Sequence, residues 1–251
     1  MSGHSKWSSI KHKKGAADAK RGKLFSKLAR AIIVAAREGG GDAAANLALQ
    51  NAIEKARSYS MPKDNIERAI ARGAGSEGDG DAYEPIAYEG YGPSGVALIV
   101  EALTDNRNRT AAEVRHIFAQ HDGSLGGSGS VAWLFERRGV VLVPAGGVDE
   151  DELTLAAADG GADDVETDGS SFQVSSAPEA LSTVREAIES AGFEIESAEV
   201  ALVPKTNVTV DDEAAARKIL RLMDALEEND DVQDVYANFD IPEAVLETVA
   251  L

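Results

Sequence analysis

The sequence predicts an α+β protein: an N-terminal three-helix bundle followed by two α/β-sandwich-like domains, the last a ferredoxin-like βαββαβ unit inserted in the middle domain. Apolar residues recur at helical spacing as far as about residue 75. Beyond residue 83 the pattern changes to short apolar runs, which are typical of strands. Between residues 139 and 203 the order of elements is that of a ferredoxin-like unit. A chain of 251 residues is long enough for such a set of domains.

The first helix, expected over residues 20–37, has an apolar stripe and ends at the glycines of residues 39–41. Asp42 is expected to cap a second helix, and Pro62 to begin a third. Because short amphipathic helices cannot bury their stripes alone, we expect the three to pack as an antiparallel bundle.

The middle segment is predicted to contain strands over residues 83–91 and 96–103. Thr110 and Glu113 have the spacing of a capping box and predict the start of the next helix. Residues 131–135 are expected to form a further strand.

The segment after residue 139 predicts strand, helix, strand, strand, helix and strand in turn. These are expected over residues 140–143, 150–158, 164–167, 171–174, 179–190 and 194–203. The elements that the middle segment lacks follow at residues 208–210, 213–228 and 232–239. The simplest interpretation is an insertion. The expected parts are a basic arm (1–19), the bundle (20–75), a discontinuous α+β domain (82–138 plus 204–251) and the inserted domain (139–203).

Composition excludes several classes of protein. Hydrophobic residues make up 43% and charged residues 27%, and no apolar run approaches the roughly 18 residues that span a bilayer. The basic N-terminus has no apolar core of a secretory signal, so we expect a cytoplasmic protein without a membrane partner. The absence of cysteine excludes disulfides and thiolate sites.

Charge is divided unequally along the chain. The net charge is −18, but residues 1–75 hold 15 Lys and Arg against 6 Asp and Glu, a net of +9. The remainder holds 10 basic residues against 37 acidic ones, a net of −27. Such asymmetry predicts that one surface binds an anionic partner while the acidic remainder of the protein repels that partner.

The basic arm and the polar face of the first helix are the main candidate contacts with nucleic acid. Within the first 30 residues, nine Lys and Arg stand against one acid, Asp18. A solvated surface is the alternative interpretation, but this density favours an anionic partner. With two arginines discussed next, the predicted nucleic-acid-binding residues are Lys6, Lys11, His12, Lys13, Lys14, Lys20, Arg21, Lys23, Lys27, Arg30, Arg107 and Arg109.

The motif of residues 105–110 lies between a predicted buried strand and a helix N-terminus, where free N–H groups favour an anion. Arg107 and Arg109 could hold a phosphate there. Alternatively, Asn108 or Thr110 only caps the helix while the arginines pair with nearby acids such as Glu113. The two interpretations are compatible.

No catalytic constellation is recognisable. The glycine-rich residues 123–130 lack the Gly-Lys-Ser/Thr ending of a phosphate loop, no histidine pair has metal-ligand spacing, and no serine lies in a nucleophile elbow. We therefore expect no enzyme, no cofactor, no metal and no small-molecule substrate.

With these motifs in view, the chain resembles the YebC/PmpR family from end to end. The resemblance is carried by residues 3–7 (GHSKW), 11–13 (KHK), 18–23 (DAKRGK), 39–42 (GGGD), 61–64 (MPKD), 88–93 (YEGYGP) and 104–110 (TDNRNRT). It implies a three-domain protein that is not an enzyme. In part of the family it implies a DNA-binding transcriptional regulator, and in another part a ribosome-associated translational activator that binds rRNA.

Overall fold

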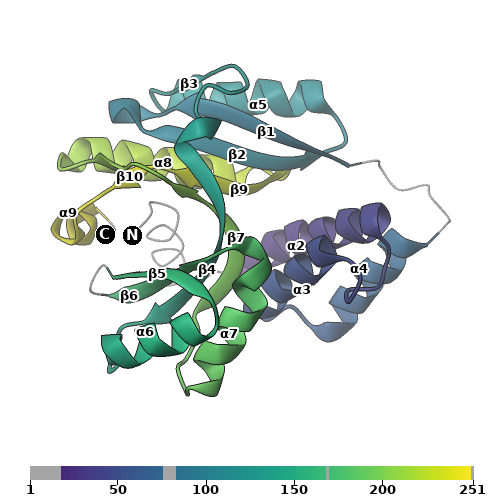
Figure 1. Cartoon of the computed structure of the whole chain (residues 1–251). Coiled ribbons are helices and arrows are strands. Elements are labelled where there is room, and N and C mark those ends of the chain that lie inside the picture. Colours follow the sequence, from purple (N-terminus) through teal and green to yellow (C-terminus); the bar gives the residue numbers. More distant parts are fainter. Residues whose placement is uncertain (1–17, 76–82, 168–169, 250–251) are drawn as a thin grey trace.

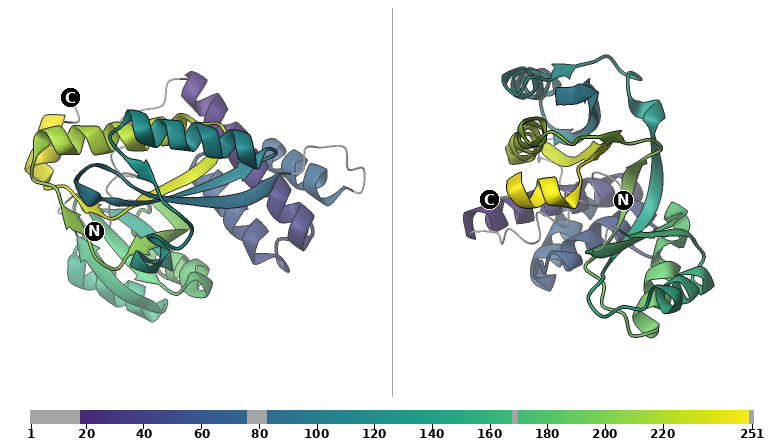
Figure 2. Two further views of the ribbon diagram at one scale, coloured as in Figure 1. Left: turned by 90° about the horizontal axis from the view of Figure 1, so that it is seen from above. Right: turned by 90° about the vertical axis from the view of Figure 1, so that its left-hand side faces the viewer.

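The computed structural model describes residues 18–75, 83–167 and 170–249, and their elements form three lobes (Figure 1). The bundle lobe holds the N-terminal helices, and the middle and insert lobes each hold a four-stranded sheet with two helices packed on it. Figure 2 shows the same three bodies from two further sides. The predicted α+β class is confirmed. None of the helices in the described part of the chain is long and apolar enough to cross a membrane.

The bundle lobe consists of α2 (Asp18–Gly39), α3 (Leu47–Ser58) and α4 (Lys63–Ala74). As predicted, the third helix follows Pro62. Its core is formed by large apolar side chains from all three helices and the turn before α4, including Leu28, Ile32, Leu49, Ile53, Met61 and Ile66.

The cap of α3 differs from the prediction. Asn46, not Asp42, precedes the helix, and its Oδ1 accepts a hydrogen bond from the Leu49 N–H at 3.1 Å. The buried Asn46 amide also donates to the carbonyl oxygens of Ala35 and Gly40, each at 2.8 Å. Asp42 instead accepts from the Ala44 N–H within the preceding turn. An amide provides both the acceptor and the donors that this buried position needs, and a carboxylate provides only acceptors.

Replacing Asn46 by alanine is expected to lower the free energy of unfolding by about 1–3 kcal/mol, because a cap and two buried hydrogen bonds are lost together. Asp42→Ala is the matched control and should change it by less than about 0.5 kcal/mol. Urea unfolding followed by circular dichroism measures both. A larger loss for Asp42→Ala than for Asn46→Ala would contradict the observed cap.

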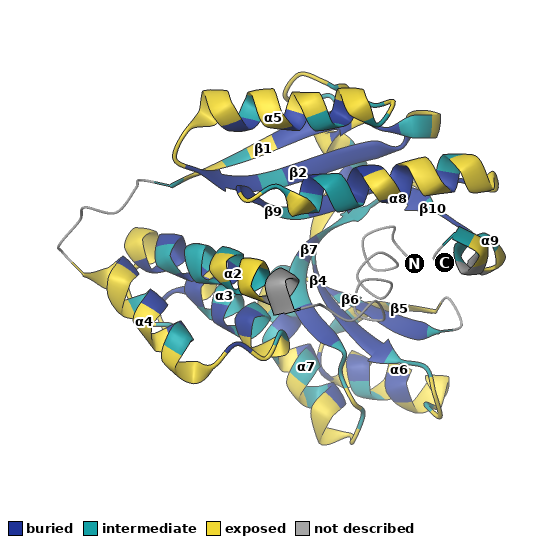
Figure 3. Cartoon of the chain, turned by 180° about the vertical axis from the view of Figure 1, so that it is seen from behind, coloured by how far each residue is buried: buried dark blue, intermediate teal, exposed yellow. Residues whose placement is uncertain are grey.

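The middle lobe is built from two parts of the chain. Its sheet has the order β3-β1-β2-β9, and all neighbouring pairs are antiparallel. Helices α5 and α8 cover one face of this sheet and turn their buried sides toward it (Figure 3). Because β9 follows the insert lobe in sequence, the insert interrupts the middle lobe. The bounds are β1 Glu84–Tyr91, β2 Ala97–Thr104, α5 Arg107–Gln120, β3 Ser124–Leu125, α8 Glu213–Glu228 and β9 Val232–Ala237.

The insert lobe has the strand order β5-β6-β4-β7, which is the antiparallel ferredoxin-like order with its helices α6 and α7 on one face. Its first strand starts earlier than predicted. The bounds are β4 Phe135–Pro144, α6 Glu150–Asp159, β5 Ala162–Thr167, β6 Ser171–Ser176, α7 Leu181–Ser190 and β7 Ser197–Pro204, with a 3-10 turn at Pro178–Ala180.

The predicted strand over residues 131–135 was wrong, because Ala132–Leu134 form a 3-10 turn and only Phe135 joins β4. The carboxylate of Glu89 accepts hydrogen bonds from the N–H groups of Gly129, Val131 and Ala132 at 2.6 to 2.8 Å. N–H groups bound to a side chain are not available to a strand ladder. Burial raises the pKa of Glu89, but these three bonds outweigh it and leave the pKa below its usual value.

The C-terminal elements also depart from the prediction. The segment expected at residues 208–210 is the short strand β8 (Val208–Thr209), which pairs in parallel with β10 (Phe239–Asp240) and not with the four-stranded sheet. A further helix, α9 (Glu243–Val249), follows. No helix was expected there from the sequence.

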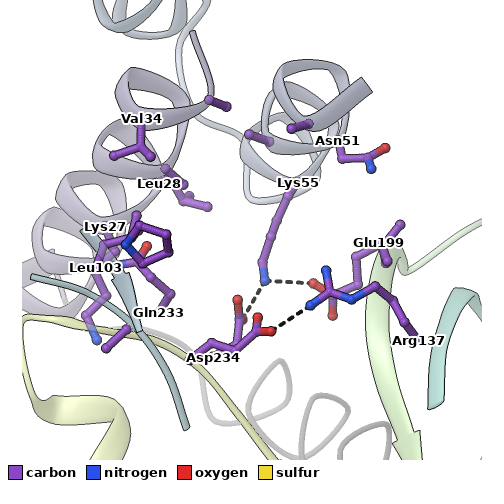
Figure 4. Close-up of a pocket in the computed structure, with 18 of the residues that line it drawn as sticks. Lys27, Leu28, Val34, Asn51, Lys55, Leu103, Arg137, Glu199, Gln233 and Asp234 are labelled. Carbon is purple, nitrogen blue, oxygen red and sulfur yellow. Dashed lines mark hydrogen bonds and ion pairs between the residues drawn. The ribbon is translucent and has the colours of Figure 1, made fainter. Parts of the chain in front are cut away.

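A half-buried lysine connects the three lobes. The Nζ atom of Lys55 on α3 lies 2.5 Å from Asp234 Oδ1 on β9 and 2.9 Å from Glu199 Oε2 on β7 (Figure 4). Each lobe therefore contributes one charged group to the same cluster. Burial lowers the pKa of Lys55, but the two carboxylates outweigh it and raise the pKa well above its usual value. Lys55 is held in its charged form.

Candidate nucleic-acid interface

Seven of the twelve predicted contact residues cannot be placed by their side chains. Lys6, Lys11, His12, Lys13 and Lys14 lie outside the described residues. Lys20 and Arg21 lie in the first turn of α2, where only the backbone is described. Their role in binding stays a prediction.

The cationic face of α2 lies against the C-terminal end of α8. Lys23 Nζ donates to the carbonyl oxygen of Glu228 at 2.5 Å and lies 2.9 Å from Asp230 Oδ1. Lys27 Nζ donates to the carbonyl oxygen of Glu227 at 2.6 Å. The last carbonyl groups of a helix have no intrahelical donors and carry partial negative charge, so cations are favourable there. We call residues 227–231 the acidic segment.

Asp231, at the end of this segment, is the centre of a buried polar cluster. Its carboxylate lies 2.6 Å from Arg109 NH2 and 3.3 Å from Arg30 NH1, and accepts from Thr110 Oγ1 at 2.7 Å. Thr110 Oγ1 also lies 2.7 Å from Thr104 Oγ1. Burial raises the pKa of Asp231, but the bonds from Arg109 and Thr110 outweigh it and hold the pKa below its usual value.

The predicted capping box at Thr110 and Glu113 was wrong. Helix α5 is capped by Asn106, whose Oδ1 accepts from the Arg109 N–H at 3.1 Å. Thr110 is buried one turn inside the helix, where its hydroxyl donates a hydrogen bond to the Asp231 carboxylate. An asparagine is a strong cap by itself and needs no glutamate three residues later.

Both arginines of the 105–110 motif pair with acids. Arg107 Nε lies 3.7 Å from Glu84, and both side chains are exposed. Arg109 NH2 lies 2.8 Å from Asp105 and 2.6 Å from Asp231, and its Nε lies 3.9 Å from Glu113. The structure therefore shows the alternative in which the arginines pair with acids and an asparagine caps the helix, although the capping residue is Asn106.

The two predicted regions meet in one place, because Arg30 of α2 and Arg109 of α5 both contact Asp231. A hollow of about 460 Å³ opens beside them. Five of its lining residues are acidic against two arginines, so the hollow does not attract an anion as it stands. Its lining consists of Arg30, Tyr83, Asp105, Arg109, Glu113, Glu228, Asn229, Asp230 and Asp231.

Three exposed arginines that were not among the predicted contacts lie on the bundle lobe. Arg37 on α2 and Arg68 and Arg72 on α4 line a groove between these two helices. Among the described residues, no carboxylate pairs with any of the three. The signal was present in the sequence, since Arg68 and Arg72 are four residues apart and face the same side of a helix.

Another hollow, about 770 Å³, lies where the three lobes meet, around the Lys55 cluster (Figure 4). Its walls are formed by α2 and α3 and by strands of the middle and insert lobes, and its cations are paired with acidic groups or carbonyl oxygens. It lacks the unpaired cations that a phosphate needs. Among the residues described, no group of three or more His, Asp or Glu is arranged to hold a metal ion.

Family models match nearly the whole chain. One described as the TACO1/YebC protein N-terminal domain matches residues 5–76, and one described as the TACO1/YebC second and third domain matches residues 83–239.

Full-length relatives and a solved structure are also similar. A probable transcriptional regulatory protein of Rubrobacter xylanophilus is 60% identical over 250 residues, which cover 100% of both chains. One of Acidothermus cellulolyticus is 57% identical over 249 residues, covering 99% of this chain and 100% of the relative. The crystal structure of a conserved hypothetical protein from Aquifex aeolicus is 51% identical and superposes with a TM-score of 0.79, over 90% of this chain and 93% of that one.

Proposed function

Because the chain belongs to the TACO1/YebC family, we propose that it is a cytoplasmic nucleic-acid-binding regulator that acts as a DNA-binding transcriptional regulator. The relatives named probable transcriptional regulatory proteins support the regulatory part of this proposal. No enzymatic step is needed for it.

The observation that carries the proposal is the position of the cations that lack acidic partners. On the bundle lobe, Arg37, Arg68 and Arg72 are exposed and unpaired with acids, whereas Lys23, Arg30 and Arg109 contact acidic groups of the middle lobe. Residues 1–17 of the basic arm contain four lysines and no acid, and they directly precede α2 in the sequence. The other lobes are strongly acidic, so a polyanion would meet the molecule at the bundle lobe.

A ribosome-associated function, with binding to rRNA, is the second candidate. It is favoured because, among the described residues, few side chains that could read bases lie beside Arg37, Arg68 and Arg72. The one amide that lines their groove, Asn65, accepts a hydrogen bond from Arg68. Phosphate contacts position a protein on nucleic acid but carry no sequence information.

Deleting residues 1–14 is expected to weaken nucleic-acid binding severely and leave the thermal midpoint nearly unchanged. Four lysines are lost, so the slope of log affinity against log salt should become less steep by about 3 to 4. Fluorescence anisotropy with duplex DNA and structured RNA, measured from 50 to 300 mM salt, tests this. Equal affinity of the full and truncated chains for both probes would refute a role for the arm.

A competition at physiological salt separates the two candidates. The competitors are a selected best DNA site, random DNA and purified ribosomes. A preference of about a thousandfold or more for one DNA site is expected of a sequence-specific regulator. Tight ribosome binding that excess DNA does not displace would refute the transcriptional role and support the ribosomal one.

A further inference from the structure

The groove between α2 and α4 consists of two adjoining hollows of about 240 and 310 Å³. The two share the lining residues Ser26, Ala29, Ile33 and Arg72, so they form one continuous channel along the helix pair. Figure 3 shows both helices, with exposed residues along their outer sides.

The groove is shallow and narrow because the two helices approach each other closely. A Cβ atom at Gly73 of α4 would lie 2.4 Å from the carbonyl oxygen of Ile33 on α2, so only glycine permits this spacing. Small side chains, Ser26 and Ala29 on α2 and Ala69 on α4, leave the hollow open.

Three guanidinium groups line this groove without acidic partners. Arg37 and Arg72 make no hydrogen bond or ion pair with any described residue, and Arg68 donates only to the Asp64 carbonyl and to the amide oxygen of Asn65. On α4, Arg68 and Arg72 are separated by about 6 Å along the helix axis. Guanidinium groups bind phosphate oxygens with several donors at once.

Aromatic rings lie at both ends of the channel. Phe25, half-buried, lines one end together with Met61. Tyr83 lines the other end, and the Arg30 guanidinium is stacked 4.5 Å from the centre of its ring. Because Arg30 is also paired with Asp231, this stacked pair is held in place.

We propose that this groove binds the sugar-phosphate backbone of a single-stranded nucleic acid, which rests on the proposed function that the chain binds nucleic acid. Proteins that bind single strands combine a cationic groove that follows the backbone with aromatic rings that contact the bases. Both parts are present here: the three arginines lie on α2 and α4, Phe25 lies on α2, and Tyr83 directly precedes β1. Phosphate binds to Arg37, Arg68 and Arg72, and bases contact the rings at the ends.

A duplex does not suit the same surface. Its bases are read by an element that protrudes into a groove of the DNA about 12 Å wide. Here the arginines line a shallow groove between two helices, and the rings at its ends can contact bases only where these are unpaired. The preferred partner is therefore an unpaired segment of DNA or RNA.

The test compares two triple variants of the full chain with the same net charge. Arg37→Gln/Arg68→Gln/Arg72→Gln removes the groove cations, and Arg57→Gln/Arg115→Gln/Arg221→Gln removes three exposed arginines elsewhere. The probes are a labelled 12-nucleotide single-stranded RNA, the same sequence as single-stranded DNA, and its duplex. Binding is followed by fluorescence anisotropy at several salt concentrations.

We expect the groove variant to bind either single strand roughly 10- to 100-fold more weakly than wild type, with a salt slope reduced by about 2, as three lost contacts require. The control triple should stay within about threefold of wild type, and the duplex should be affected less than the single strands. An Arg→Lys variant at the three groove positions should retain most of the affinity, which distinguishes lost charge from lost folding.

If wild type binds but the groove and control variants lose affinity equally, or if the duplex is affected most, the groove assignment is overturned while the proposed function stands. If wild type binds none of the probes, the proposed function itself fails.

Discussion

Replacing Lys55 by methionine is expected to lower the free energy of unfolding by about 3–5 kcal/mol. The substitution keeps most of the side-chain volume but leaves the half-buried carboxylates of Asp234 and Glu199 close together without a counter-charge, and unpaired charges that are largely removed from water are strongly destabilising. Because the pKa of Lys55 is raised, the contribution is fully present below about pH 10.4 and is lost only as pH rises through the higher folded value. Urea unfolding at pH 7 measures the loss.

Two further variants make the Lys55 test specific. Lys218→Met removes an exposed lysine that pairs with Asp122 at 2.8 Å, and it should leave the urea midpoint unchanged. Lys55→Met combined with Asp234→Asn and Glu199→Gln removes the repulsion and should recover part of the loss. If Lys55→Met unfolds at the same urea concentration as wild type, the cluster does not hold the lobes together.

Replacing Asp231 by alanine is the second large effect, expected at about 3 kcal/mol or more at pH 7. The change leaves Arg30 and Arg109 facing each other and removes the acceptor of the buried Thr110 hydroxyl. Asp230→Ala is the matched control, since that neighbouring carboxylate is 71% exposed and pairs only with Lys23 among the described residues.

The Asp231 contribution depends on pH in a predictable direction. Its folded pKa is lowered, so the stabilisation is present above the unfolded value of about 3.9 and is lost as pH falls through the folded value. Wild type should therefore lose stability more steeply than Asp231→Ala on acidification from pH 5 to pH 2. If the free energy of unfolding falls equally with pH in both proteins, Asp231 does not titrate as the geometry requires.

The periodic elements were predictable from sequence because their signals are local. The helix at residues 213–228 was predicted with the observed bounds, and the βαββαβ order of the insert lobe follows from alternation and helical spacing. The exceptions were elements determined by tertiary hydrogen bonds that no periodic pattern reveals. The turn at residues 132–134 depends on Glu89, and the cap of α3 depends on the carbonyls of Ala35 and Gly40.

The candidate interface was less predictable than the fold. A cationic helix face predicts an anionic partner, but sequence does not distinguish a phosphate from the carbonyl groups at the end of another helix of the same chain. Lys23, Lys27 and Arg30 contact residues about 200 positions later in the sequence. Arg68 and Arg72 were missed because α4 carries only a modest excess of basic residues, and its free surface is visible only once the groove is formed.

That separation along the chain has a consequence for biosynthesis. Domains generally fold in order during translation, at roughly 5–20 residues per second, so the bundle lobe, complete once α4 is made, can fold about 8–30 s before the acidic segment at residues 227–231 is made. Throughout that interval Lys23, Lys27 and Arg30 lack the acceptors that residues 227–231 later provide. During this time the bundle lobe is a cationic domain tethered to the ribosome, close to ribosomal RNA. Residues 227–231, in the last tenth of the chain, then cover its basic side chains.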